Sequence, residues 1–198
     1  MAHSTDSPVE GLLEGSVKAP VDGQRPKAYQ LKISISDSVP EIWRRFVVPA
    51  NVTLAELHLI LQRTMGWESL HDYGFHMGVG LDKTHFDTQK VLSDVLAVVG
   101  DRPLYYLYDF KGGWLHRLEV EALDVSTEGD EPVTLPMCLD GAEACPIEGS
   151  GGVWGYDELM DRLDDPSDPE YMGLIEKYGS FDPGAFDVAV VNARLQEA

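Results

Sequence analysis

The chain has 198 residues, 43% of them apolar, which is enough for one domain of ordinary size with a full hydrophobic core. It contains 15 basic and 34 acidic side chains, a formal net charge of −19, and this sign disfavours nucleic acid as a partner. No segment approaches the roughly 20 apolar residues of a membrane helix. The start of the chain lacks the pattern of a secretion signal and only two cysteines occur, so we expect a soluble cytoplasmic protein.

Acidic side chains are concentrated in the last third of the chain, where residues 122–198 contain 3 basic and 18 acidic groups. A solvated surface that keeps the protein soluble explains such a region, and a docking surface for a basic partner is the alternative. In either case the charge indicates repulsion of nucleic acid and carries no catalytic meaning of its own.

Residues 1–27 contain several prolines, glycines and serines without a sustained period, so we expect a flexible tail. Alternation of apolar and polar residues then begins at Ala28 and predicts a strand through Ile35. The β-rich residues 42–48 stop at Pro49 and predict a second strand paired with the first. The folded part is therefore expected to open with a β-hairpin.

Two helices are indicated in the next part of the chain. Thr53 and Glu56 have the spacing of a capping box, apolar residues follow at steps of three and four, and a helix is predicted over residues 54–65. Ser93 as N-cap and Gly100 at the end predict a shorter helix over residues 92–99. Between the two helices, residues 73–79 alternate and predict a strand.

Residues 103–123 have the clearest hairpin pattern, because two alternating runs flank a turn at Lys111-Gly112-Gly113. The segment that follows, residues 124–153, is rich in proline and glycine, and we expect a long loop there.

The remainder of the chain has helical patterns. One helix is predicted around residues 156–163 and another from Asp168 to Gly179. The segment from Phe186 to Leu195 is compatible with helix or strand, and we favour helix. This order of elements predicts an α+β fold, a single domain over residues 28–198 with a mainly antiparallel sheet packed by helices.

Three blocks of motifs resemble the plasmid pRiA4b ORF-3-like family over about residues 28–195. They are Ile42-Trp43-Arg44-Arg45-Phe46-Val47-Val48-Pro49 with Thr53-Leu54-Ala55-Glu56-Leu57-His58, Gly66-Trp67, His71 and Phe75; then Tyr108-Asp109-Phe110 with Trp114 and His116; then Pro136, Cys138, Gly141, Cys145-Pro146, Glu148, Gly151-Gly152 and Gly155-Tyr156. The resemblance implies an α+β domain but no particular reaction. Some members carry a transposon-passenger, resolvase-like label, which a strongly acidic chain does not support.

The sequence departs from the family pattern at two positions. The family usually has an acidic residue before the hairpin tryptophan, where this chain has Lys111 and Gly112. It also usually has aspartate after the glutamate that corresponds to Glu148, where this chain has Gly149. If the family is enzymatic, the loss of two carboxylates implies that this member is impaired.

One set of residues is the candidate functional cluster, because imidazole with carboxylate can form a zinc or manganese site or a general acid–base pair. The set consists of His71, Tyr108, Asp109, Trp114, His116 and Glu148, with His71, Asp109, His116 and Glu148 as the candidate metal ligands. Sequence spacing does not establish that they meet. The competing interpretation is that the two histidines are structural, each hydrogen-bonded to hold loops against the sheet.

Other polar residues have ordinary structural explanations. His58 lies on the apolar face of its helix, which is typical of a core histidine. Arg44 and Arg45 point to opposite faces of a strand, and we expect them to pair with surface carboxylates. Cys138 and Cys145 lack the spacing and the second pair of a zinc site, so buried thiols are expected.

Three functions remain open. The leading hypothesis is a non-enzymatic module, without a cofactor, that binds a protein partner or a small ligand through the aromatic hairpin and the Cys138–Gly152 loop. The alternative is a metal-dependent hydrolase or nuclease-like enzyme that uses the candidate metal ligands and a divalent cation. The third hypothesis is a DNA-acting accessory protein of a transposon or plasmid. Such a protein needs a basic surface, which this acidic composition hardly provides.

Overall fold

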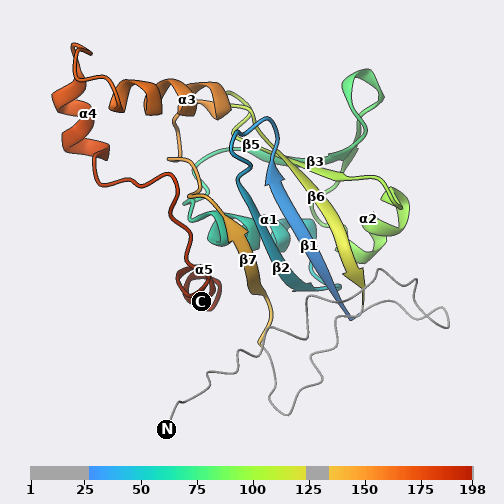
Figure 1. Cartoon of the computed structure of the whole chain (residues 1–198). Coiled ribbons are helices and arrows are strands. Elements are labelled where there is room, and N and C mark those ends of the chain that lie inside the picture. The colour runs from blue at the N-terminus through green and yellow to red at the C-terminus, as the bar shows by residue number, and fades with distance from the viewer. Residues whose placement is uncertain (1–26, 124–133, 198) are drawn as a thin grey trace, which may run out of the picture.

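The computed structural model describes residues 27–123 and 134–197. The predicted flexible tail lies outside the described residues, apart from its last position. Within the described part, seven strands form one sheet in the order β4-β3-β5-β6-β1-β2-β7, and every neighbouring pair is antiparallel. Five α-helices accompany this sheet (Figure 1). The predicted single α+β domain with a mainly antiparallel sheet is therefore confirmed.

The first hairpin forms as predicted from strands β1 (Ala28–Ile35) and β2 (Trp43–Pro49). β1 also pairs with β6 (Trp114–Leu123), so it is an interior strand. Its alternating apolar side chains point into the core. On the opposite face, Arg45 of β2 reaches over β1 to Glu121 of β6, with 2.5 Å between Nε and Oε2. Both faces of β1 are therefore covered.

Helix α1 (Leu54–Met65) has the predicted bounds and packs behind the sheet in the view of Figure 1. Its capping box is complete: the Thr53 hydroxyl accepts from the Glu56 amide, and the Glu56 carboxylate accepts from the Thr53 amide. The C-cap, Gly66, has φ of 79°, a left-handed conformation that glycine adopts without a steric penalty. Leu54, Leu57, Leu61 and Met65 are buried, as the period predicts.

Helix α2 (Leu92–Val99) also has the predicted bounds, but the prediction that Ser93 caps it is wrong. The N-cap is Val91, and Ser93 is buried inside the first turn. The amide of Leu92 donates to Val52 O and that of Ser93 to Ala50 O. Because backbone carbonyls from the segment before α1 satisfy these donors, α2 needs no capping side chain.

One half of the sheet is formed by β3 (Tyr73–Met77), β4 (Thr84–Phe86), β5 (Leu104–Tyr108) and β6. The β5–β6 hairpin and its turn are confirmed. β3 ends two residues earlier than predicted, because Gly78 turns the chain with φ of 79° into a 3₁₀ turn at Gly80–Asp82. The sequence did not indicate β4, whose three residues are too few for a visible alternation.

Strand β7 (Met137–Ala142) corrects the expectation of a continuous loop over residues 124–153. It pairs with β2 at the edge of the sheet, and the register shifts between Arg45 and Phe46. Asp140 and Gly141 have low strand propensity, which hid the strand in the sequence. The strand forms because it pairs with β2, a contact between residues almost a hundred positions apart in the chain.

The last three helices are α3 (Gly152–Leu163), α4 (Tyr171–Tyr178) and α5 (Val188–Leu195). α5 is a helix, as favoured, and it lies beside β7, whereas α3 and α4 extend away from the sheet (Figure 1). Arg162 at the end of α3 binds the carboxylates of Asp168 and Glu170 in the connection to α4. Among the described residues, no helix combines the length and the apolar character that crossing a bilayer requires.

Candidate functional site

Tyr108 and Glu148 lie at the centre of the predicted cluster. The Tyr108 hydroxyl, at the end of β5, donates to Glu148 Oε1 in the loop after β7. The same carboxylate accepts the amides of Glu68, at 2.8 Å, and Leu70, at 3.4 Å. Burial, and then the contact with Glu148, raise the pKa of the Tyr108 phenol, so it remains a donor. Glu148 therefore links residues 68–70 to the β5–β6 hairpin through three hydrogen bonds, and this contact is called here the Glu148 clasp.

His71 and Asp109 lie next to this clasp. Their Nδ1 and Oδ1 atoms are 3.9 Å apart, and the His71 amide donates to the Tyr108 hydroxyl. Asp109 is buried, has φ of 53°, and accepts the amide of Lys111. Both side chains line an open cleft of about 760 Å³. The cleft lies between residues 69–72 before β3, the turn of the β5–β6 hairpin and the loop before α3. The structure thus brings together His71, Tyr108, Asp109 and Glu148.

The other two predicted residues, Trp114 and His116, belong to the core. His116 is fully buried, with Nδ1 3.2 Å from Tyr106 O and its ring against Trp67. Burial lowers the pKa of His116 to about 4, so the ring is neutral near pH 7. Trp114 is 1% exposed and packs against Trp67 and Tyr156. The alternation of β6 places both residues on its inner face.

The four candidate metal ligands do not form one site. His116 is separated from His71 by the packed aromatic rings, and Glu148 is already occupied by its donors. In residues 27–123 and 134–197, no group of three or more His, Cys, Asp or Glu side chains is placed to hold a metal ion. Of the residues predicted to form an acid–base pair, His71 and Asp109 are the two whose side chains lie close together on the open cleft.

His58 is a core histidine, as its helical position predicts. Its ring stacks on Tyr73 with 3.6 Å between centroids, and Nδ1 lies 2.7 Å from the Tyr106 hydroxyl. Gln62 donates to the same hydroxyl. Burial lowers the pKa of His58 to about 4, so the Tyr106 hydroxyl donates to a neutral imidazole.

Arg44 was missed by sequence reasoning. Arg45 pairs with Glu121 as expected, but the expectation of a surface pair is wrong for Arg44, which is 3% exposed. Its guanidinium donates to the carbonyl oxygens of Trp43, Ala142 and Glu143 and to Cys145 Sγ. A Cβ on Gly141 would lie 2.7 Å from Arg44 Cδ, so this glycine of β7 makes the space. The sequence gives no sign that Arg44 of β2 pairs with Gly141 of β7.

A second feature missed by sequence reasoning is a hollow of about 430 Å³ under α3, called here the α3 hollow. Apolar side chains from the β1–β2 turn, β6 and α3 line it, and three carboxylates also belong to its lining. The lining residues are Ser38, Val39, Pro40, Ile42, Trp114, Val153, Tyr156, Met160 and Pro183, and the acidic ones are Glu143, Asp157 and Asp161. Burial, and then Asp157 and Glu143, raise the pKa of Tyr156 to about 12, which is consistent with carboxylates close to its phenol.

Gly112, where the family usually has a carboxylate nearby, is tightly enclosed. A Cβ on Gly112 would lie 2.4 Å from Asp109 Oδ2 and 3.2 Å from the Gly152 amide. Gly149, the other departure, has φ of 80° and open space around its Cβ position. An acidic side chain at position 112 would thus require a different hairpin turn, whereas one at position 149 would be limited only by the backbone conformation.

We expect Tyr108→Phe to lower the free energy of unfolding by about 1–2 kcal/mol, because Glu148 loses a donor and the His71 amide loses its acceptor. Urea denaturation at pH 7 measures this change. Tyr105→Phe is the control, since Tyr105 lies on the same strand and its ring stacks on His76. Equal losses of unfolding free energy in the two variants would show that the hydrogen bonds of the Tyr108 hydroxyl do not stabilise the fold more than those of an ordinary tyrosine.

The comparisons with known proteins agree with the fold. A family model described as "Plasmid pRiA4b ORF-3-like protein" matches residues 27–190. An uncharacterized protein, y4hQ of Sinorhizobium fredii, is 36% identical over 174 residues, which are 82% of this chain and 85% of that protein. The crystal structure of a protein of unknown function, MM3350 from Methanosarcina mazei Go1, superposes with a TM-score of 0.72 at 35% identity, covering 84% of this chain and 98% of that one. The chain therefore belongs to the plasmid pRiA4b ORF-3-like family.

Proposed function

We propose that the chain is a non-enzymatic binding module that takes a basic segment of a partner protein into the α3 hollow. The observation that carries the proposal is the set of three carboxylates, Glu143, Asp157 and Asp161, in the lining of an apolar depression. In the described part of the chain, none of the three has an ion-pair partner. Carboxylates left without counter-charges beside apolar surface are suited to lysine or arginine side chains.

The lining of the hollow supports a peptide as occupant. Its volume is in the range of ordinary ligand sites. Trp114 contributes apolar surface to the wall, as do Ile42 and Met160. Apolar contact and three acidic groups together match an extended basic segment.

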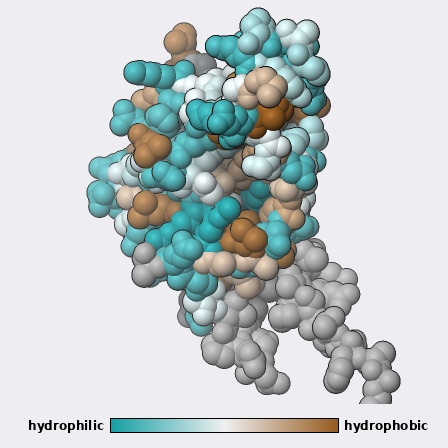
Figure 2. Space-filling view, turned by 90° about the vertical axis from the view of Figure 1, so that its left-hand side faces the viewer, coloured by the Kyte–Doolittle hydropathy of each residue, from teal (hydrophilic) through white to brown (hydrophobic). Residues whose placement is uncertain are grey.

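Charge over the surrounding surface supports the same class of partner. The acidic last third of the chain includes α3 and α4, and Figure 2 shows the face on their side as largely hydrophilic with separate hydrophobic patches. A field of this sign attracts basic segments and repels acidic ones before contact. Both cysteines are free thiols, which fits a partner in the reducing cytoplasm.

The polar cluster at Tyr108 supports binding over catalysis. Glu148 has its oxygen atoms occupied by a hydroxyl and two amides, and His116 is buried in the core. Groups that are satisfied by their own chain are poor acids, bases or metal ligands for a substrate. Glu148 and His116 therefore have structural roles, and of the predicted residues His71 and Asp109 line the open cleft.

Fluorescence anisotropy with a labelled twelve-residue peptide of alternating lysine and leucine tests the proposal. We expect the full-length protein to bind it at 50 mM salt and more weakly at 200 mM. Combining Glu143→Gln, Asp157→Asn and Asp161→Asn should weaken binding about tenfold or more, because three favourable charge pairs are lost.

The matched control combines Glu158→Gln, Asp164→Asn and Glu176→Gln, which removes the same charge from α3 and α4 outside the hollow. We expect less than about a threefold change, by general screening of the field. Equal weakening in both triple variants would refute the hollow as the site. Equal affinity for a peptide with glutamate in place of lysine would refute the basic partner.

A further inference from the structure

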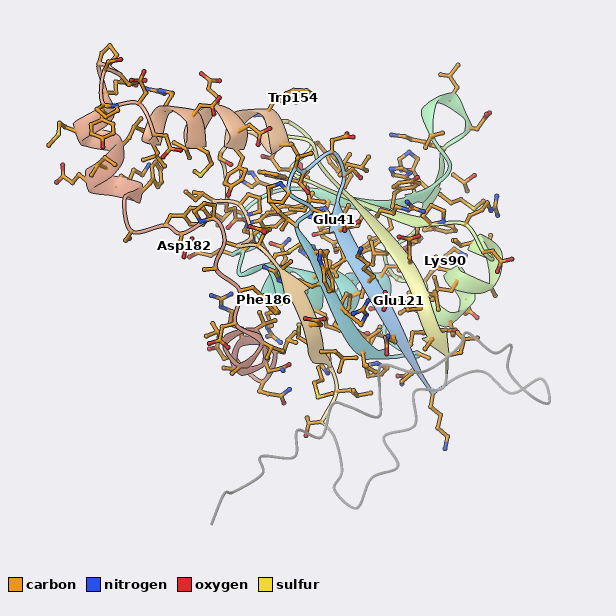
Figure 3. All side chains as sticks on the ribbon, viewed as in Figure 1. Glu41, Lys90, Glu121, Trp154, Asp182 and Phe186 are labelled. Carbon is orange, nitrogen blue, oxygen red and sulfur yellow. The ribbon has the colours of Figure 1, made fainter. Side chains whose placement is uncertain are left out.

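A second depression, called here the arginine cleft, shares no lining residue with the α3 hollow. It has a volume of about 980 Å³ between the end of α1, residues 144–148, residues 180–187 and α5. Figure 3 shows Asp182 and Phe186 on the segment that joins α4 to α5, next to β7. Two of the few arginines of this acidic chain, Arg44 and Arg194, contribute to its lining.

Arg44 brings a buried positive charge that has no carboxylate partner among the described residues. Its hydrogen bonds go to three carbonyl oxygens and a thiol, and the Phe186 ring lies 4.6 Å from its guanidinium carbon. Its Nε has no partner within the described residues. Burying a cation is unfavourable unless it is paired, and the hydrogen-bond partners of this guanidinium are neutral groups.

Arg194 brings the second positive charge. Its guanidinium lies against Gly66 at the end of α1, where a Cβ would be only 2.5 Å from Nη1. The side chain is partly exposed and makes no hydrogen bond or ion pair with any described residue. Burial raises the pKa of the Cys145 thiol, and both Arg44 and Arg194 act in the opposite direction. Both arginines line the cleft together with Cys145.

The remaining lining restricts the kind of anion. Four carboxylates line the cleft, and three of them already accept amides: Glu148, Asp182 and Asp187. Their charge opposes a dianion such as phosphate more strongly than a ligand with a single negative charge. Apolar side chains provide the rest of the wall, namely Met65, Phe181, Phe186, Val190 and Val191.

We propose that the arginine cleft binds a small organic monocarboxylate with an apolar body, whose carboxylate pairs with Arg194. The buried Arg44 acts from behind, as a fixed positive charge that the ligand neutralises. The apolar body lies on the Phe181 and Phe186 side of the cleft. No reaction is implied, since the ligand is bound by charge and contact alone.

Isothermal titration calorimetry with the full-length protein tests this site, using phenylacetate, inorganic phosphate and 2-phenylethylamine as probes. We expect phenylacetate to bind, and the other two to bind at least tenfold more weakly. Arg194→Gln should reduce phenylacetate binding at least tenfold, and Arg194→Lys should restore part of it because the charge returns. The control is Arg63→Gln, which removes an α1 arginine outside the cleft and should leave affinity unchanged.

A second measurement uses the unaltered protein, in case Arg194→Gln impairs folding. Phenylacetate should slow the labelling of Cys145 by iodoacetamide at least threefold, as located by peptide mass spectrometry, because the thiol lines the same cleft. Tighter binding of phosphate or of the amine would overturn the monocarboxylate. An equal loss in Arg63→Gln, or unchanged labelling of Cys145 at saturating phenylacetate, would overturn the site.

Discussion

Gly152→Ala is expected to lower the free energy of unfolding by about 3 kcal/mol. A Cβ at this position would lie 1.9 Å from the carbonyl oxygen of Gly112, so either the hairpin turn or the start of α3 must move. Gly152 also has φ of 77°, which costs an alanine about 1–2 kcal/mol. Overpacking against fixed backbone adds about 1–3 kcal/mol. Urea denaturation followed by tryptophan fluorescence measures the loss.

Gly149→Ala separates the two contributions to this prediction. Gly149 has nearly the same φ, 80°, but nothing lies within 4 Å of its Cβ position. We expect it to lose about 1 kcal/mol, from the conformation alone. If Gly152→Ala costs no more than Gly149→Ala, the close approach of the hairpin turn to α3 is not a constraint on the fold.

The second prediction is a loss of stability in mild acid that arises from His116. Its pKa is about 4 in the folded protein and 6.5 as the ordinary value, so the unfolded chain binds the proton more readily between these limits. Stability from this group is therefore present above pH 6.5 and falls as the pH drops toward 4. Between pH 7 and pH 5 the loss from His116 alone is about 2 kcal/mol. Burial lowers the pKa of His58 as well, and its contribution has the same sign.

Unfolding free energies at pH 7 and pH 5 measure this effect. His116→Gln should remove about 2 kcal/mol of the difference between the two pH values, whatever it does to stability at pH 7. His85→Gln is the control for the substitution itself, because His85 is exposed on the short strand β4. The same pH dependence in wild type and His116→Gln would contradict the buried neutral imidazole.

Local patterns predicted most of the fold. The alternation of β1, the capping box of α1 and the hairpin turn after β5 involve neighbours in the chain, so the sequence contains the whole signal. Contacts between distant segments account for the errors. β7 exists because β2 provides its partner, and α2 begins without a capping side chain because carbonyls from residues 50–52 supply the acceptors.

The candidate site was predicted in part, for a similar reason. Tyr73 pairs with Tyr108 in the β3–β5 register, and this pairing brings His71 beside Asp109. A residue type can suggest chemistry, but only that register makes the two groups neighbours. The inward position of His116 could have been inferred from the sequence, because it alternates with Trp114 and Leu118 on β6. The contacts of Arg44 depend on the pairing of β2 with β7, and the α3 hollow depends on α3 lying near the β1–β2 turn and Trp114, so neither had a local signal.

The contact between α5 and β7 has a consequence for assembly. Asn192 of α5 accepts the amide of Cys138 through Oδ1 and donates to its carbonyl through Nδ2, as a neighbouring strand would do. Gln196 donates to Pro136 O just before the strand. The helix thus blocks β-augmentation on this side, so copies of the chain cannot extend the sheet into a fibre there. Of the two sheet borders in the described residues, the one left for a new strand is the three-residue β4.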